Sequence, residues 1–376
     1  MAHIFKKATE NQKGIVVFTH KELSYFEGKL PSWKALIKTP KSYCGKFLKK
    51  IFQSREIRKK LLSIKQDYYI GVHWGFHSEN IETPPWVDFH MSAPGTCTFK
   101  GSPFVIPLSS ANFTPKVMRN ENKEKYWDLI CVAKNDNKKK YYELLRAIRK
   151  IYDLGYSYKI IFVVASNKNE PNNAYYTKLL KDYYENFSAQ ERESFTIIKT
   201  HPDTGFQGFS YTFLSHLYNE SKVFTIFSQK EGECRVIKEA QLCGLPIVVK
   251  SDMEGGGRDY LNEKNSVMFD EYHEAHNAII KAVESYQDYV VDYESIEWDL
   301  GEESSTKKLK SYLYELYKKD GKCFDYDLIN TDNLNRRLPA HFFDESILWA
   351  KSPKFRFSTT DIVNKGMFYK LLKALY

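Results

Sequence analysis

Between residues 126 and 286 the sequence alternates regularly between short apolar runs and longer amphipathic stretches, and this alternation limits the possible folds more than any other feature. The apolar runs have the length of buried strands, and the amphipathic stretches have the length and spacing of helices. Such an alternation predicts a parallel, doubly wound α/β sheet. The expected strands are 128–133, 159–164, 195–199, 223–227, 247–249 and 266–269, and the expected helices are 139–154, 174–187, 211–219 and 273–286, with one more that ends at Gly244.

The rest of the chain predicts a second domain and a C-terminal extension. At 376 residues the chain is long enough for two domains. Expected strands over 14–19 and 67–72 indicate a first domain over 1–115, which ends in a crossing that contains two prolines. The next domain spans 116–290. Residues 291–376 are expected to form a helical extension that packs back on the first domain, with contact to a membrane as the weaker alternative.

Composition excludes several classes of protein. The chain has no run of about 18 apolar residues, which argues against a transmembrane helix. Its first 14 residues lack the apolar core of a secretory signal. The six cysteines include no C-x-x-C pair, which predicts reduced thiols in a cytoplasmic protein and no structural zinc site. The formal net charge of +9 is diffuse and no recognition motif accompanies it, so nucleic acid is not expected as a partner.

One basic stretch, from Lys46 to Lys65, carries apolar residues at helical spacing. A basic amphipathic helix of this kind can lie on an anionic bilayer. A surface helix with a solvated basic face explains the same pattern equally well. The location expected from the sequence is therefore cytoplasmic, with peripheral contact to the inner face of the membrane as an open alternative.

Residues 224–248 hold two carboxylates in a strand–turn–helix–strand arrangement. Glu231 falls in the turn after the strand, and Glu239 lies eight residues later. At about 3.6 residues per turn, both lie near one side of the helix. Ligands of open α/β sheets bind at the carboxyl ends of parallel strands. This stretch is therefore the first candidate for a binding site.

A polar, aromatic stretch directly follows the expected strand 67–72 and includes His73, Trp74 and His77. Residues of these types at the carboxyl end of a strand can line a catalytic cleft. A lone histidine is more often a hydrogen-bonded structural residue. Both interpretations stay open for His73 and His77.

The segment 228–249 resembles the E-x7-E signature of the large family of retaining glycosyltransferases with the GT-B fold, with Glu231 and Glu239 as the two acids. That family includes many bacterial enzymes of lipopolysaccharide, capsule and lipid-linked oligosaccharide synthesis. An E-x7-E alone is a weak signature, because many sequences contain one by chance.

Three other stretches strengthen the resemblance, because they follow in the order of that family. Residues 105–115 are similar to its interdomain linker, 131–139 to its first C-domain strand and basic pair, and 252–261 to its glycine loop with a following acid. The resemblance implies a GT-B fold of two Rossmann-like domains that face a cleft. The N-terminal domain would be abbreviated, with the C-terminal tail packed on it.

The resemblance also implies an activity, the metal-independent transfer of a sugar from a nucleotide-sugar donor to a saccharide or lipid-linked acceptor, with retention. Two lysines and the N–H groups at the start of a helix would hold the leaving diphosphate, so no cofactor is expected. One acid would contact the transferred sugar and the other the ribose. The residues assigned are, as catalytic, Glu231, Lys139, Lys134 and His77; as donor-binding, Glu239, Gly232, Glu233, Cys234, Arg235, Ser228 and Val236; and on the acceptor side, His73 and Trp74.

Some residues depart from the family pattern. Glu233 and Cys234 replace the usual aromatic and small residues after the first Glu-Gly, and Lys134 replaces the usual arginine. A negative charge at Glu233 is unfavourable beside a diphosphate unless its side chain points away. A subunit that binds a nucleotide sugar or a partner without turnover is therefore the alternative function. A nucleotide-sugar 2-epimerase is disfavoured, because the E-x7-E and linker motifs fit a transferase better.

Overall fold

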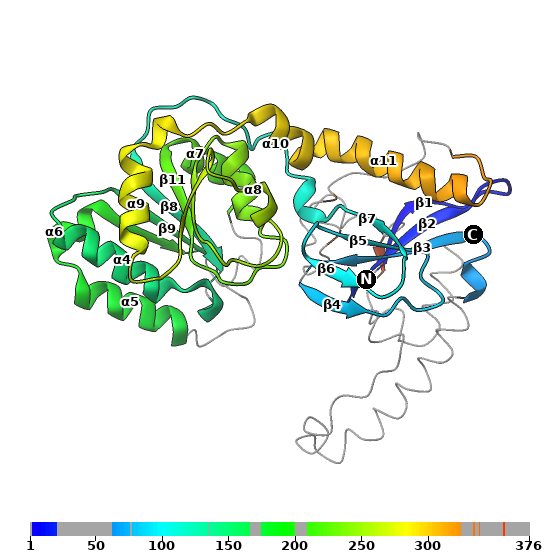
Figure 1. The fold of residues 1–376 in the computed structure, drawn as a ribbon, viewed down its shortest axis with the longest axis horizontal. Helices are drawn as coiled ribbons and strands as arrows, with labels where there is room; N and C mark the ends of the chain where they lie inside the picture. The colour runs from blue at the N-terminus through cyan, green and yellow to red at the C-terminus, as the bar shows by residue number, and fades with distance from the viewer. Residues whose placement is uncertain are drawn as a thin grey trace, which may run out of the picture. The chain divides into compact units, whose positions relative to one another are not determined.

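The computed structural model describes residues 2–20, 62–75, 77–134, 136–165, 174–199 and 209–324, together with positions 334, 338, 356 and 357. Two compact units form (Figure 1): unit 1 holds residues 1–110 and the segment that begins at Thr306, and unit 2 holds Ala111–Ser305. The boundaries expected from the sequence are 115 and 290. Most of the expected basic helix 46–65, and all of the tail 366–376, lie outside the described residues.

Unit 2 is built on six parallel strands, in the order β10-β9-β8-β11-β12-β13. Counted along the unit, this order is 3-2-1-4-5-6, which is that of a doubly wound Rossmann sheet. The winding reverses between β8 and β11, so the carboxyl ends of these two strands are where a ligand is expected. The strands are β8 (Trp127–Lys134), β9 (Ile160–Ala165), β10 (Phe195–Lys199), β11 (Ser221–Ile226), β12 (Ile247–Lys250) and β13 (Ser266–Phe269).

Helices cover both faces of this sheet (Figure 1). Successive side chains of a strand point to opposite faces, and accordingly Leu129 and Cys131 of β8 enter one core while Ile130 and Val132 enter the other. Helices α4, α5 and α9 contribute to the first core, and α7, α8 and α10 to the second. The helices are α4 (Tyr141–Asp153), α5 (Ala174–Asn186), α6 (Ala189–Ser194), α7 (Tyr211–Asn219), α8 (Arg235–Leu242), α9 (Ala275–Glu284) and α10 (Tyr293–Leu300).

The two ends of unit 2 are hydrogen-bonded to each other. Thr114 N donates to Leu300 O at 3.1 Å, and Glu302 N donates to Thr114 O at 3.2 Å. The Ser305 hydroxyl also donates to the backbone oxygen of Asn112. The chain therefore begins and ends this unit at one place.

Unit 1 holds a sheet of six strands in the order β14-β1-β2-β3-β5-β7, of which β2, β3, β5 and β7 run parallel. β1 is antiparallel to β2 and to β14. The last turns of α11 pack on this sheet, since the ring of Tyr317 lies 4.7 Å from that of Tyr69. The elements are β1 (Ala2–Lys6), β2 (Gly14–Thr19), β3 (Tyr68–Trp74), β4 (Ser78–Ile81), β5 (Phe89–Ser92), β6 (Cys97–Phe99), β7 (Phe104–Ile106), α11 (Glu302–Lys319) and β14 (Arg356–Phe357), with β4 and β6 in a separate two-stranded sheet.

The α/β fold class expected from the sequence, with two Rossmann-like domains of the GT-B type, is confirmed by these two sheets. Long apolar runs predicted the central strands correctly, because strands buried on both faces need no polar alternation. In the described part of the chain, no helix is both long and apolar enough to cross a membrane.

Candidate active site

Two loops meet at the switch point of the unit 2 sheet, and the first of them follows β8. Asp136 caps a short 3-10 turn (Asn137–Lys139) by accepting a hydrogen bond from Lys138 N at 2.9 Å. Lys140, with φ 54° and ψ 38°, then turns the chain into α4. This tight turn places Lys139 at the carboxyl edge of the sheet, where the sequence analysis expects a basic residue.

The second loop follows β11 and is braced by the glycine loop 255–257. Glu231 N donates to Glu254 O at 2.9 Å, and Gly256 N donates to Gly232 O at 2.7 Å. Gly255 has φ 103°, and a Cβ added there would lie 1.9 Å from Glu231 O. A side chain at this position would therefore clash with the backbone, in addition to the strain of a positive φ. Glycine is required here because the two loops touch.

Lys139 and Glu231 form an ion pair and a hydrogen bond between these loops. Their side chains are 16% and 10% exposed, so the pair is largely withdrawn from water. Burial disfavours the charged form of Lys139, but the adjacent Glu231 carboxylate outweighs this effect and the pKa of Lys139 is raised. The two predicted catalytic groups are thus in contact.

Lys134 ends β8 on the same edge of the sheet. Although part of its side chain is exposed, the surrounding protein desolvates its ammonium and lowers its pKa to about 8, and the like charges of Arg235 and Lys139 act in the same direction. Three cationic groups therefore influence one another here, against the carboxylate of Glu231. An anionic ligand would relieve this repulsion.

The amino end of α8 adds backbone donors to this cluster. Cys234 precedes the helix in a left-handed conformation (φ 31°, ψ 61°), and its side chain makes no capping hydrogen bond. Burial raises the pKa of its thiol, which stays protonated and uncharged. Unpaired N–H groups and the positive end of the helix dipole attract anions. Val236, in the first turn, is half-buried.

Glu239, the second acid of the predicted signature, is buried in α8 at 5% exposure. The hydroxyl of Tyr218 lies 3.4 Å from its Oε2 and donates to it. Burial and the charge of Glu239 raise the pKa of Tyr218, which keeps this proton donor in place. Ser228, two residues after β11, is fully buried, and its hydroxyl has no hydrogen-bond partner within the described residues.

A further cation in α8, Lys238, is not among the residues that the sequence analysis assigned. Lys238 is fully buried, and its ammonium lies 5.0 Å from the ring of Tyr260. It has no hydrogen-bond partner among the described residues. Burial lowers its pKa to about 8, and the nearby charge of Glu233 opposes that effect. Glu233, itself 9% exposed, therefore has a cation close to its own charge.

The residues assigned to the acceptor side lie in unit 1. His73, on β3, is 1% exposed and accepts a hydrogen bond from Ser110 N at 3.3 Å. Trp74 is 5% exposed, and its indole N–H donates to Nδ1 of His90 at 3.0 Å. His77 lies 3.9 Å from a carboxylate oxygen of Glu79. His73 and Trp74 are thus held in place by the fold.

His90, on β5, is a further buried histidine of unit 1 and was not predicted from the sequence. Its Nδ1 accepts from Trp74, so its proton is on Nε2, which lies 3.1 Å from Oγ1 of Thr83. Burial lowers the pKa of His90 to about 4, so it is neutral at pH 7. His90 lies in a short strand whose four residues are all buried, and nothing in the local sequence predicts that its ring is hydrogen-bonded to Trp74 and Thr83.

Comparison with known proteins bears on unit 2. Residues 114–293 match the family model described as glycosyl transferases group 1. This segment is therefore similar to the glycosyltransferases of group 1. The matched segment holds every donor-side residue assigned from the sequence, whereas the acceptor-side residues His73 and Trp74, and His77, precede it. Among the described residues, no three or more His, Cys, Asp or Glu side chains of the chain are grouped to hold a metal ion.

Several solved structures are similar to the chain. They include the pneumococcal O-GlcNAc transferase GtfA in complex with UDP and GlcNAc (TM-score 0.47, 16% identity, 68% of this chain and 54% of that one). S. aureus TarM is also similar (TM-score 0.48, 12% identity, 66% of this chain and 51% of that one). Sucrose-phosphate synthase from Thermosynechococcus elongatus is a third similar structure (TM-score 0.45, 12% identity, 81% of this chain and 68% of that one). The aligned region spans about half the length of the first two proteins. No curated protein matches the sequence.

Proposed function

We propose that the chain transfers a sugar from a nucleotide-sugar donor to a saccharide or lipid-linked acceptor, with retention and without a metal ion. The observation that carries this proposal is the pair Lys139–Glu231 at the switch point of a domain similar to the glycosyltransferases of group 1. The pair joins a cation and a carboxylate at the edge of the sheet where ligands of this fold bind.

The cations account for the donor diphosphate. Breaking the bond between sugar and phosphate builds negative charge on the phosphate oxygens. Lys134, Lys139 and the N–H groups at the start of α8 would stabilise that charge, as preorganised donors do in other transfer reactions. These donors would take the place of a divalent ion.

The carboxylates account for the sugar and the ribose. Glu231, in the loop, would accept hydrogen bonds from hydroxyls of the transferred sugar, and Glu239, deeper in α8, from the ribose hydroxyls. A charged acceptor makes the stronger hydrogen bond. Because Glu231 is paired with Lys139, it is a weak nucleophile, which disfavours a covalent double displacement. The leaving phosphate would instead take the proton of the acceptor hydroxyl on the same face of the sugar.

A nucleotide-sugar panel tests the proposal. Donors are first screened for thermal stabilisation of the chain and then for release of nucleoside diphosphate, with and without a mixture of saccharide and lipid-linked acceptors. The Lys139→Met variant is expected to lose about 100-fold or more in kcat/KM, in line with the loss of one preorganised donor. Lys138→Met, an exposed lysine of the same turn, is the matched control and should keep full activity.

Lys139→Met also leaves Glu231 without its partner, which by itself can destabilise the domain. The double variant Lys139→Met/Glu231→Gln removes both charges and should keep the melting temperature while it loses transfer. Full activity of the single variant would refute the proposal. Binding of a donor without release under any condition would favour the alternative, a non-catalytic binding subunit.

A further inference from the structure

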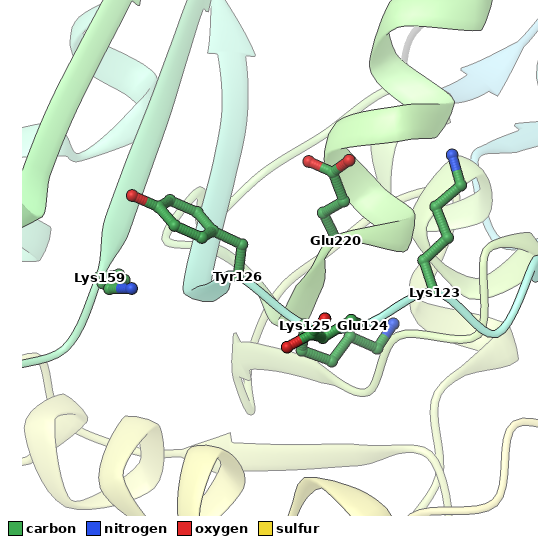
Figure 2. Close-up of a pocket in the computed structure, with 6 residues that line it drawn as sticks. All are labelled: Lys123, Glu124, Lys125, Tyr126, Lys159 and Glu220. Carbon is green, nitrogen blue, oxygen red and sulfur yellow. The ribbon is translucent and has the colours of Figure 1, made fainter.

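Unit 2 has a pocket on the edge of its sheet opposite the candidate active site (Figure 2). Its volume is about 570 Å³, and we call it the Tyr126 pocket. It lies where β8, β9 and β11 begin, whereas the Lys139–Glu231 pair lies where β8 and β11 end. The eight residues of β8 separate the two places by about 25 Å. The pocket is lined by Lys123, Glu124, Lys125, Tyr126, Lys159 and Glu220.

Hydrogen bonds fix the backbone around this pocket. Tyr126 N and Trp127 N both donate to Glu220 O, at 2.8 and 2.9 Å. The ammonium of Lys125 donates to Asn219 O at 2.7 Å, and Asn219, which is fully buried, donates in turn to Arg119 O at 2.9 Å. The lining is thus formed before any ligand arrives, which lowers the entropy cost of binding.

The pocket combines an open aromatic ring with charged groups on both sides. Tyr126 is 56% exposed, and its ring packs edge-to-face against that of Trp127, with 4.9 Å between the ring centres. Lys159 lies 4.1 Å from the centre of the Tyr126 ring. Figure 2 shows Tyr126 at one side, Lys123 at the other and the Glu220 carboxylate between them. Each part would contact a different part of one ligand.

These groups match the chemistry of a sugar ring that bears an acidic group. The flat, exposed face of Tyr126 suits the apolar C–H face of a pyranose. The carboxylates of Glu124 and Glu220 can accept hydrogen bonds from hydroxyls, and the ammonium of Lys159 can hold a carboxylate or phosphate, whereas that of Lys123 is paired with Glu121 at 3.0 Å. The Lys159 ammonium, 4.1 Å from the centre of the Tyr126 ring, lies where a substituent of a bound ring would lie, and this placement favours an acidic over a neutral sugar.

We infer that the Tyr126 pocket is a non-catalytic binding site for an acidic saccharide, a sugar ring that carries a carboxylate or phosphate. A site of this kind would hold one part of a long saccharide while the chemistry takes place elsewhere. The inference does not require that the chain transfers sugars, because binding here can be measured in the absence of any donor.

Calorimetric titration with four probes tests this inference: a hyaluronan tetrasaccharide, glucose 6-phosphate, the uncharged chitotetraose, and inorganic phosphate. At least one of the two acidic sugars should bind, and it should bind more tightly than chitotetraose and inorganic phosphate. Tyr126→Ala should weaken that binding about fivefold or more, as expected for loss of one aromatic contact. Tyr184→Ala is the matched control, since Tyr184 is 61% exposed on α5, and it should change nothing.

Two further variants separate this site from the candidate active site. Lys159→Met should weaken binding of the acidic sugar and leave binding of chitotetraose unchanged, because the substitution removes only the charge. Lys139→Met should leave binding of the acidic sugar intact even if transfer is lost. The inference is overturned if neither acidic sugar binds, if inorganic phosphate binds as tightly as both, or if Tyr126→Ala binds as well as the parent chain.

Discussion

Replacing Lys238 by methionine should make unit 2 more stable, even though it removes a residue beside the candidate active site. The lysine is fully buried, and its ammonium has no hydrogen-bond partner within the described residues. A pKa of about 8 in the folded chain, against an ordinary value of 10.5, means that folding with the charge present costs about 3 kcal/mol. Methionine has a similar length and no charge, so it would fill the same space without that cost.

The pH dependence gives this prediction a definite sign. Below pH 8 the ammonium is charged in both the folded and the unfolded chain, so the full cost is present and the variant is more stable by about 3 kcal/mol. Between pH 8 and 10.5 the folded chain releases the proton while the unfolded chain keeps it, and the stability of the parent rises. At pH 10 the gain of the variant should have fallen to about 1 kcal/mol.

The assay is urea unfolding followed at a single buried thiol of the same unit. Cys243 is fully buried, and alkylation of its sulfur by iodoacetamide, read by mass spectrometry, reports opening of unit 2. The matched control is Lys250→Met: Lys250 is also buried but pairs with Asp252 at 2.8 Å, so its loss should not stabilise the unit. A Lys238→Met variant that is less stable at pH 7, or whose gain is the same at pH 10, would show that the reasoning is wrong.

Three further predictions concern the same unit. Affinity for nucleoside diphosphates, measured by calorimetry, should fall as the pH rises through about 8, because Lys134 then loses its proton, and Lys134→Arg should keep its affinity to higher pH. Gly255→Ala should lower the melting temperature strongly, because the new methyl group meets backbone at 1.9 Å, whereas Gly155→Ala, with φ 89° and open space around it, should cost only about 1 kcal/mol. The Glu191 carboxylate, whose pKa Arg149 lowers to about 2, should contribute stability that is lost as the pH falls from 4.5 towards 2, and acid unfolding of Glu191→Gln should lack that part.

The sequence predicted the sheet of unit 2 well because its strands are buried on both faces and read as unbroken apolar runs. Strands β10 and β13 and helix α7 begin and end where the periodicity places them. The elements that the sequence did not predict are those that are stabilised mainly by contacts with the rest of the fold. β1 is a short strand that runs antiparallel at one side of β2, and α10 has only two buried residues, Ile296 and Leu300.

In the candidate active site, too, local patterns predicted some features and the tertiary fold decided the others. Spacing and strand ends were sufficient to select Lys139 and Glu231, 92 residues apart, and the structure brings them into contact. Their contact depends on the placement of β8 beside β11, which follows from the 3-2-1-4 strand order and not from any local pattern. Lys238 could not be selected, because its burial depends on Tyr260 from a distant loop. The position of this lysine beside the apolar residues Ile237 and Ala240 is the sequence feature that could have predicted a buried lysine.

The hydrogen bonds that join the two ends of unit 2 make this unit an exchangeable cassette. Since Thr114 is bonded to both Leu300 and Glu302, the unit is attached to the remainder of the chain through one closed point, as an inserted domain is. Evolution or a protein engineer can therefore replace residues 111–305 as a block, provided that the two ends keep their spacing. Under the proposed function, a chimera that receives the corresponding block of a group 1 glycosyltransferase would take its nucleotide preference from the insert and keep unit 1 from its host.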